Sequence, residues 1–330
     1  MGGETDMERG KILELLAGAE GYLSGEEVSR RLGVTRAAVW KEMEALRAAG
    51  WPIESAPRRG YILSGDAPCL SGDYLSGRLG AGSLFAGKIQ AEEVVDSTNT
   101  RLKALGAAGA PEGTVVLAEE QTGGRGTQGR GFYSPRGTGL YLSALLRPRT
   151  DLASLFTLTG WAAVAVRRGI VRACGAPAEI KWLNDLYLNG RKLCGILTEL
   201  SLLGESGEPD YVVVGVGVNV GQSRADFAAQ GLEDVATSLG AEGFGVDRSR
   251  LCVCILQELE ALARSFPHAR AEYLADYRSH CLTPGRRVSF RQAGAEHFGT
   301  AAGVDDRFAL SVLGDDGTDY EISSGSVTLL

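Results

Sequence analysis

One segment of this chain, Gln121-Thr-Gly-Gly-Arg-Gly-Thr-Gln-Gly-Arg-Gly-Phe-Tyr-Ser-Pro135, is rich in glycine and carries two arginines. It comes soon after the apolar run 114–118. Glycine lets a backbone approach a ligand closely, and arginine beside exposed backbone N–H groups binds phosphate or carboxylate. The segment therefore predicts an anion-binding loop at the end of a strand.

The same segment contains the spacing G-x-G-x-x-G, from Gly124 to Gly129. A dinucleotide-binding fingerprint of this kind must open a helix, whereas further glycines and Pro135 follow here. We therefore expect a loop that closes over a ligand. A solvated basic loop with no ligand is the alternative that the local sequence leaves open.

Charge and cysteine content exclude some classes of protein. The 330 residues allow two or three domains, and the net charge of −7 argues against a protein that coats nucleic acid, while it allows one small DNA-reading module. The cysteines form no C-x-x-C pair, and histidine is too sparse for a zinc site of familiar spacing. We find no signal peptide and no apolar run long enough for a bilayer, and expect a cytoplasmic protein without a membrane partner.

Residues 7–65 have the pattern of a winged helix-turn-helix. An amphipathic helix ends near Gly18, a capping-box pattern at Ser24 and Glu27 opens a second helix, and Thr35 caps a third over 36–49. Two short strands around a basic turn follow and predict a wing. We expect the third helix and the wing to bind DNA through Thr35, Arg36, Lys41, Arg58 and Arg59. The alternative is a helical protein-interaction domain, because acids and bases nearly balance here.

The rest of the chain predicts two further domains after a linker at 64–68. Between residues 70 and 280, strand-like runs alternate with helix-like runs, and three strands follow one another with few helices between them, which favours a mixed sheet flanked by helices. Short strands separated by glycines then predict a small β-barrel. The sequence thus indicates an α+β multidomain protein with domains at 1–65, 66–282 and 283–330.

A second segment with functional side chains runs from Lys181 to Lys192. Asn189-Gly190 is a strong hairpin signal that joins a strand ending at 188 to one beginning at 192. If Lys181 and Asp185 lie on one strand, they share a face, and Lys192 lies across the hairpin. Lysine can neutralise phosphate or carboxylate, and aspartate can hold Mg²⁺ or orient the lysine. A surface ion pair on a hairpin is the alternative.

Two shorter segments complete the pattern. Gly215-Val-Gly-Val-Asn219 places glycines inside a strand, where another group must approach closely, although tight sheet packing explains them equally well. Ser97-Thr98-Asn99 lies at a strand-to-helix junction, where helix N–H groups favour an anion, although a plain N-cap is also sufficient. The chain contains no Walker loop, no H-E-x-x-H and no G-x-S-x-G, so chemistry that positions two substrates and neutralises charge fits best.

These segments, in this order, resemble those of biotin–protein ligases. The shared motifs are Ser97-Thr98-Asn99, Gly124-Arg-Gly126, Lys181-Trp-x-Asn-Asp185, Arg191-Lys192-x-x-Gly195 and Gly215-x-Gly-x-Asn219. With the N-terminal helix-turn-helix, the chain resembles the members of that family that also repress the biotin operon, over nearly its whole length. The C-terminal strands then correspond to the family's small SH3-like domain.

The resemblance implies a biotin–[acetyl-CoA-carboxylase] ligase. ATP and biotin would give biotinyl-5′-adenylate and pyrophosphate, and a lysine of a biotin carboxyl carrier protein would displace AMP. The implied catalytic residues are Arg125, Lys181, Asp185 and Lys192, with Mg²⁺ at Asp185. The implied biotin-binding residues are Ser97, Thr98, Asn99, Gln121, Gly124, Arg125, Gly126, Lys192 and Gly195. The implied nucleotide-binding residues are Arg125, Asn184, Lys192 and Asn219. A homodimer of the adenylate-bound form would bind operator DNA.

The sequence departs from the family at several positions. Thr127 stands where the family usually has a further arginine that helps retain the adenylate, and we expect Gln128 or Arg130 to replace part of its role. Leu183 stands where proline is common, with a small expected effect on strand geometry. Phe227 is the candidate for the aromatic residue that stacks on adenine.

Two other functions stay open from the sequence. One is a biotin-responsive repressor whose ligase is inactive, which Thr127 favours and the three charged residues Lys181, Asp185 and Lys192 oppose. The other is a lipoate-type ligase with the same acyl-adenylate chemistry. The glycine-rich loop and the Lys-Trp-x-Asn-Asp segment favour biotin over lipoate.

Overall fold

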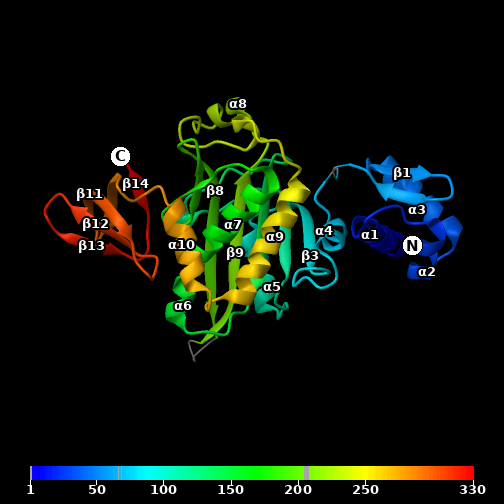
Figure 1. Ribbon diagram of the computed structural model, residues 1–330, viewed down its shortest axis with the longest axis horizontal. Helices are drawn as coiled ribbons and strands as arrows, with labels where there is room; N and C mark the ends of the chain where they lie inside the picture. Colours follow the sequence, from blue (N-terminus) through cyan, green and yellow to red (C-terminus); the bar gives the residue numbers. More distant parts are fainter. Residues whose placement is uncertain (1, 66, 68, 204–207) are drawn as a thin grey trace.

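The computed structural model describes residues 2–65, 67, 69–203 and 208–330. A helical unit at the N-terminus, a central sheet with helices on it and a small C-terminal sheet follow one another along the long axis of the molecule (Figure 1). No helix among the described residues is both long enough and apolar enough to cross a membrane.

The N-terminal unit is a winged helix-turn-helix, as predicted. Its helices are α1 (Gly2–Ala17), α2 (Gly25–Leu32) and α3 (Arg36–Ala48), and its wing strands are β1 (Ile53–Ala56) and β2 (Gly60–Leu63). Buried residues of α3 form its inner side: Val39, Glu42, Met43 and Leu46. The first helix already begins at Gly2, ahead of residue 7, where the helix-turn-helix pattern was expected to begin.

The helix caps of this unit follow the sequence closely. Thr35 Oγ1 accepts the amide of Ala38 at 3.2 Å, and Ser24 Oγ accepts the amide of Glu27 at 3.1 Å. The second half of the expected capping box is not formed, because the Glu27 carboxylate accepts from Arg30 and Arg31 instead. The N-terminal ends of α2 and α3 are thus each capped by one side-chain hydrogen bond, and Glu27 with Arg30 and Arg31 forms an additional charge cluster on the surface of α2.

A helix that the sequence did not predict connects this unit to the central sheet. Of the expected linker 64–68, residues 66 and 68 lie outside the described part of the chain. Helix α4 (Gly72–Leu79) follows and packs on α1 as well as on the central elements. A methyl group at Gly77 would lie 2.2 Å from the carbonyl oxygen of Glu14, so the two helices cross in close contact.

The central sheet has seven strands in the order β3-β4-β5-β9-β8-β7-β6. They are β3 (Ile89–Val95), β4 (Val115–Gln121), β5 (Gly139–Leu146), β6 (Glu179–Lys181), β7 (Asp185–Leu188), β8 (Arg191–Leu202) and β9 (Pro209–Asn219). Only β3 and β4 are paired in parallel, and the other pairs are antiparallel. The predicted mixed sheet is therefore confirmed.

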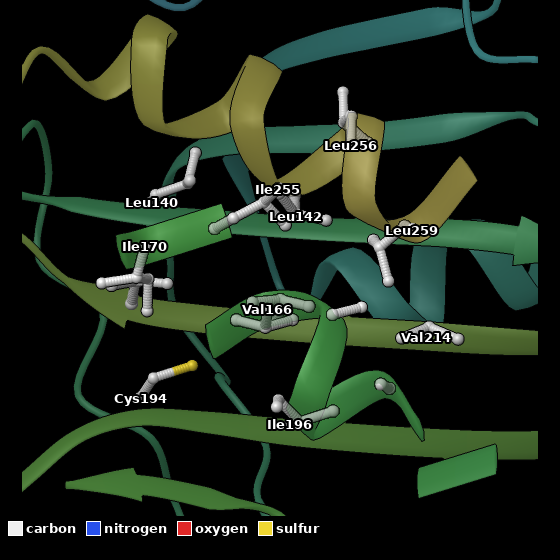
Figure 2. Packing of buried hydrophobic residues seen from close by; sticks show 14 of the residues in the cluster. Leu140, Leu142, Val166, Ile170, Cys194, Ile196, Val214, Ile255, Leu256 and Leu259 are labelled. Atoms are coloured by element: carbon white, nitrogen blue, oxygen red, sulfur yellow. The ribbon is translucent and has the colours of Figure 1, made fainter. Parts of the chain in front are cut away.

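Helices cover one face of this sheet and bury the main core against it. They are α6 (Leu152–Phe156), α7 (Leu158–Cys174), α9 (Arg248–Ser265) and α10 (Arg270–His280). Figure 2 shows side chains of α7 and α9 lying over apolar strand residues, among them Leu140, Leu142, Cys194, Ile196 and Val214. Because strand side chains alternate between faces, the odd-numbered residues of β9, and those of β8 from Gly195 onward, face the opposite side, where α5 (Thr98–Ala107) packs.

The last part of the chain is a five-stranded antiparallel sheet in the order β13-β12-β11-β10-β14. Its strands are β10 (Arg287–Gln292), β11 (Ala295–Val304), β12 (Leu310–Gly314), β13 (Asp319–Ile322) and β14 (Val327–Leu329). A small all-β unit is thus confirmed, and its closure into an SH3-like barrel stays a prediction. Trp182 links it to the central sheet, since its indole N–H donates to the carbonyl of Phe308 at 2.8 Å.

Candidate active site

A cavity lies on the face of the central sheet that α7 and α9 leave open. It is lined by residues from the start of α5, the glycine-rich loop and strands β7, β8 and β9. Most of the residues expected to bind biotin line it: Ser97, Thr98, Asn99, Gln121, Arg125, Gly126, Lys192 and Gly195, together with Asn184 and Asp185. Gly124, the remaining residue expected to bind biotin, is not part of the lining. It packs against Ser134, since a methyl group at Gly124 would lie 2.6 Å from Ser134 Oγ.

A second cavity adjoins the first. It is lined by residues of the loop, the β6–β7–β8 region and the segment that follows β9, including helix α8 (Arg224–Ala228). Of the four residues expected to bind the nucleotide, Lys192 and Asn219 line it, whereas Arg125 and Asn184 line only the first cavity. Lys181 and Phe227, the candidate for stacking on adenine, line it as well. The two cavities share Phe132, Asp185 and Lys192, so a ligand that fills both passes these three side chains.

Strand register explains why these residues meet. Lys181 pairs with Asp185 across β6 and β7, Asp185 with Gly195 across β7 and β8, and Gly195 with Gly217 across β8 and β9. The expectation that Lys181 and Asp185 lie on one strand was wrong, because residues 182–184 form a turn between two strands. The pair still shares one site, as cross-strand neighbours. Leu183, expected to affect strand geometry, lies in that turn.

Charge is concentrated where the cavities meet. Lys192 Nζ lies 2.7 Å from Asp185 Oδ1 in a half-buried ion pair. Burial lowers the pKa of Lys181, and the positive charges of Lys192 and Arg130 act in the same direction while Asp185 opposes them. Positive charge therefore exceeds negative charge at this junction, which favours an anionic ligand.

The glycine-rich loop is closed by its own backbone hydrogen bonds. Gly126 N donates to the carbonyl of Arg130 at 2.7 Å, and Phe132 N donates to the carbonyl of Gly124 at 2.9 Å. A short 3₁₀ turn, η1 (Thr127–Gly129), lies between them, with Gln128 at a φ of 58°. These bonds give the loop a defined conformation, and its closure over a ligand stays a prediction.

The side-chain amides of three asparagines in the site donate hydrogen bonds to other groups of the protein. Asn99 Nδ2 donates to Glu199 at 2.8 Å, Asn184 Nδ2 to the carbonyl of Ile196 at 2.7 Å, and Asn219 Nδ2 to the carbonyl of Thr237 at 2.9 Å. They hold α5, the 182–184 turn and the segment after β9 against the sheet. Their predicted contacts with biotin or nucleotide stay predictions.

Phe132 is a site residue that sequence reasoning missed. A methyl group at Gly217 would lie 2.7 Å from the Phe132 ring, and one at Gly195 would lie 3.4 Å from it. Gly215 makes room for another side chain, since a methyl there would lie 2.0 Å from Asn99 Oδ1. The glycines did signal close approach, but the neighbours could not be named without the strand register.

Comparisons with known proteins agree with this geometry. The model of the Biotin/lipoate A/B protein ligase family matches residues 91–219, and that of an HTH domain matches residues 9–62. The "Bifunctional ligase/repressor BirA" of Bacillus spizizenii is 37% identical over 307 residues, which cover 92% of this chain and 93% of the relative. The protein of the same name from Escherichia coli is 32% identical over 97% of this chain and 96% of its own length. This chain belongs to the BirA family of bifunctional ligase/repressors.

A solved structure supports the fold of this BirA-family chain. The biotin protein ligase from Aquifex aeolicus, in complex with biotin and ATP, aligns with a TM-score of 0.62 and 28% identity over 74% of this chain and 99% of that one. The expected biotin–protein ligase family and the N-terminal helix-turn-helix are thus both confirmed.

The candidate DNA-binding residues of this BirA-family chain lie on one exposed unit. Thr35 begins α3, and Arg36 and Lys41 are exposed on it. Arg58 and Arg59 form the exposed wing turn, with the Arg59 guanidinium 4.1 Å from the centroid of the Tyr22 ring. Trp40, which is 60% exposed on α3, is a further candidate that the sequence reasoning did not name.

Proposed function

We propose that this chain catalyses the two-step biotinylation of a biotin carboxyl carrier protein. In the first step a carboxylate oxygen of biotin attacks the α-phosphorus of ATP, and pyrophosphate leaves. In the second, the amine of a carrier lysine attacks the acyl carbon of the adenylate, and AMP leaves. One observation carries the proposal: two cavities meet at the Lys192–Asp185 ion pair.

The cavities match the two ends of the intermediate. The first offers polar groups of Thr98 and Gln121 at its wall, which suit a ureido ring. The second has aromatic and aliphatic walls that include Tyr187 and Phe227, which suit adenine. The new acyl–phosphate bond would then form beside Lys192.

The protein would act mainly by neutralising charge and excluding water. Lys192 would face the biotin carboxylate and the α-phosphate, and Lys181 the remaining phosphate charge. Arg125, which lines the first cavity, would cover the reacting atoms when the loop closes. Positioned positive charges of this kind act on charge that develops in the transition state.

A magnesium ion fits the site as a partner of the nucleotide. Asp185 is the carboxylate at the junction, and no group of three or more His, Cys, Asp or Glu side chains that could hold a metal occurs among the described residues. Mg²⁺ in nucleotide sites commonly uses one or two carboxylates and the substrate phosphates. Asp185 would hold the ion, which would supply further charge neutralisation.

The N-terminal unit would make repression depend on biotin. We propose that the adenylate orders the loops around the site, that this ordering favours a homodimer, and that the dimer binds a two-fold operator through α3 and the wing. Biotin plus ATP should therefore raise both dimer content and DNA affinity. Unchanged values in sedimentation and in binding to the chain's own promoter DNA would contradict this coupling.

The wider organisation is proposed on the same basis. We place the domain boundaries at residues 65 and 282, so that DNA binding, ligation and the SH3-like unit follow one another. Because ATP, DNA and carboxylases occur together in the cytoplasm, we expect the chain to act there.

The experiment that tests the ligase is incorporation of labelled biotin into a biotin carrier domain, with and without ATP and Mg²⁺. Transfer that requires both ATP and Mg²⁺ supports the proposal. Biotin binding without transfer would instead favour a repressor with an inactive ligase. Lipoate in place of biotin, compared by thermal shift and by transfer, separates a lipoate-type ligase from a biotin ligase.

A further inference from the structure

Arg191 belongs to the motif Arg191-Lys192-x-x-Gly195, but it lines neither cavity of the site. It directly precedes Lys192, and successive side chains of a strand point to opposite faces. Its guanidinium lies 2.7 Å from Glu242 Oε1 in an ion pair, in which the side chain of Glu242 is only 6% exposed. Glu242 is the last residue of the short 3₁₀ turn η2 (Gly240–Glu242), and no sequence motif pointed to it.

Glu242 accepts hydrogen bonds from two separate parts of the chain. Its Oε1 accepts from Arg191 and, at 2.6 Å, from Thr237 Oγ1, while its Oε2 accepts from Asn189 Nδ2 at 2.6 Å. The hydrogen bonds from Thr237 and Asn189 lower the pKa of Glu242, so the carboxylate is ionised at neutral pH and can only accept. Asn189 and Arg191 belong to the β7–β8 hairpin, whereas Thr237 belongs to the segment after β9. The carboxylate therefore joins that segment to the hairpin.

Backbone hydrogen bonds make the same connection closer to the site. Lys192 N donates to the carbonyl of Val235 at 2.9 Å, and Thr237 N donates to the carbonyl of Lys192 at 2.9 Å. Val235 and Ala236 line the second cavity together with Lys192. The wall of this cavity is thus bonded to the backbone of the residue whose ammonium lies where the two cavities meet.

The stretch of chain that forms this wall is largely exposed. Glu233, Asp234 and Val235 all face solvent, so burial of apolar side chains contributes little to holding them in place. The position of the wall therefore depends on hydrogen bonds, and those to an ionised carboxylate are among the strong ones.

We propose that Glu242 and Arg191 are positioning residues that hold the wall at Val235 and Ala236 against β8, and so preform the nucleotide site beside Lys192. The proposal rests on the proposed function, since it takes ATP as the ligand of the second cavity. It gives Arg191 a role that does not require contact with the ligand.

Two substitutions of Glu242 test the proposal. Glu242→Met removes all three hydrogen bonds and should raise the dissociation constant of ATP about tenfold, because the nucleotide must then order the wall itself. The kcat at saturating ATP and the dissociation constant of biotin should stay within about twofold of the parent. Glu242→Gln keeps Oε1 for Arg191 and Thr237, and the amide of Asn189 can turn to accept from the new NH₂ group, so most of the ATP affinity should return. Equal losses of ATP affinity in the two variants would overturn the proposal.

Glu260→Met is the matched control. The side chain of Glu260 is also nearly buried, at 12% exposed, and accepts from Ser83 Oγ at 2.6 Å, from Leu84 N at 3.0 Å and from Arg264, but it lines neither cavity. It should lower the midpoint of thermal unfolding by an amount similar to that for Glu242→Met and leave the dissociation constant of ATP unchanged. If Glu260→Met weakens ATP binding as much, loss of stability alone explains the effect, and the positioning role is contradicted.

Thr237→Val tests the same contact with a smaller change, and applies also where Glu242→Met does not fold. Valine keeps the shape of the buried threonine and removes only the hydroxyl that donates to Glu242. The dissociation constant of ATP should rise about threefold, with kcat and biotin affinity kept. An unchanged dissociation constant of ATP in Thr237→Val would overturn the proposal. A folded parent that binds no ATP would instead overturn the proposed function.

Discussion

The two cavities of the site are built in different ways. The wall of the first is held by short neutral hydrogen bonds, such as those between Thr98 and Gln121 and between Gln121 and Ser134 at 2.9 Å. The second is bounded by charge, with Lys181 and Lys192 beside the single carboxylate Asp185. A network of neutral hydrogen bonds fixes where donors and acceptors point, and so selects a ligand with the matching pattern. Unbalanced charge, in contrast, attracts any anion of suitable size.

This difference suggests a division of labour within one site. The ureido end would provide specificity for biotin, and the phosphate end would provide the rate of adenylation. Because Lys192 and Asp185 line both cavities, substitutions of this pair should reduce the ligase activity more than substitutions elsewhere in the site.

The largest expected effect is that of Lys192→Met. Loss of this ammonium should lower ATP-dependent biotin transfer about 100- to 1,000-fold, because the pentacoordinate phosphorus and the two reacting anions lose their nearest positive charge. The measurement is single-turnover formation of biotinyl-adenylate. Lys11→Met, on the exposed side of α1, is the matched control and should react like the parent. A rate within threefold of the parent would remove Lys192 from the reaction.

Gly215→Ala should damage the first cavity more than the second. Its methyl group would lie 2.0 Å from Asn99 Oδ1, so the amide must leave Ser143. We expect a loss of about 2 kcal/mol in the free energy of unfolding, from overpacking and a broken buried hydrogen bond. Biotin affinity should fall while ATP affinity is nearly kept, as measured by denaturant unfolding and by calorimetry.

Gly221→Ala is the matched control for this change. The nearest atom to its added methyl group, the carbonyl oxygen of Thr138, would be 3.7 Å away, which is an ordinary contact. If both variants lose the same stability, close packing at Gly215 has no special role.

Much of the fold could be predicted because its signals are local. Thr35 acts as the N-cap it was expected to be, and Asn189 and Gly190 adopt the φ values of 50° and 78° that a tight hairpin needs. The glycine-rich loop and the hairpin from Lys181 to Lys192 could be assigned to the site for the same reason, because the residue types within each short motif indicate what it can bind.

The parts that could not be predicted depend on register between distant strands. Phe132 over Gly217, and Ser143 beside Asn99, become neighbours only when β5, β9 and β8 are aligned residue by residue. A slip by one residue would turn the strand residues Ser143, Gly215 and Gly217 to the other face. Helix α4 was missed for a different reason, since two glycines in eight residues weaken its helix signal.

The next prediction concerns the pH dependence of ATP binding in the second cavity. Burial lowers the pKa of Lys181 below the ordinary 10.5, so ATP affinity should begin to fall at a lower pH than for an exposed lysine, by up to about tenfold per pH unit. Lys181→Arg, which stays charged, should show a flat profile over this range. Identical profiles for the parent and Lys181→Arg in calorimetric titrations would show that Lys181 does not bind the nucleotide.

The same shift has a consequence for stability without ligand. Because the pKa of Lys181 is lowered, the folded chain binds the proton of the Lys181 ammonium more weakly than the unfolded chain does. Below the lowered pKa, the buried ammonium therefore destabilises the fold. The free energy of unfolding should rise as the pH increases through the lowered pKa toward 10.5. Lys181→Met should remove this part of the pH dependence.

The smallest expected effect is on retention of the adenylate. Thr127 replaces an arginine that the loop commonly carries, and Arg130 lines the second cavity close enough to affect the pKa of Lys181, whereas Gln128 lines neither cavity. We therefore favour Arg130 over Gln128 as the partial replacement. Arg130→Ala should speed dissociation of biotinyl-adenylate about threefold, the size expected for one partly solvated charge, and Thr127→Arg should slow it.

Stopped-flow displacement of a pre-formed adenylate measures this rate directly, with Arg149→Ala, an exposed arginine after β5, as the matched control. If Arg130→Ala releases the adenylate no faster than the parent, retention depends on the hydrogen-bonded wall of the first cavity and not on charge in the second. In that case Thr98→Val should speed release more than Arg130→Ala does. The order of these two rates therefore decides which cavity holds the intermediate while the carrier lysine approaches.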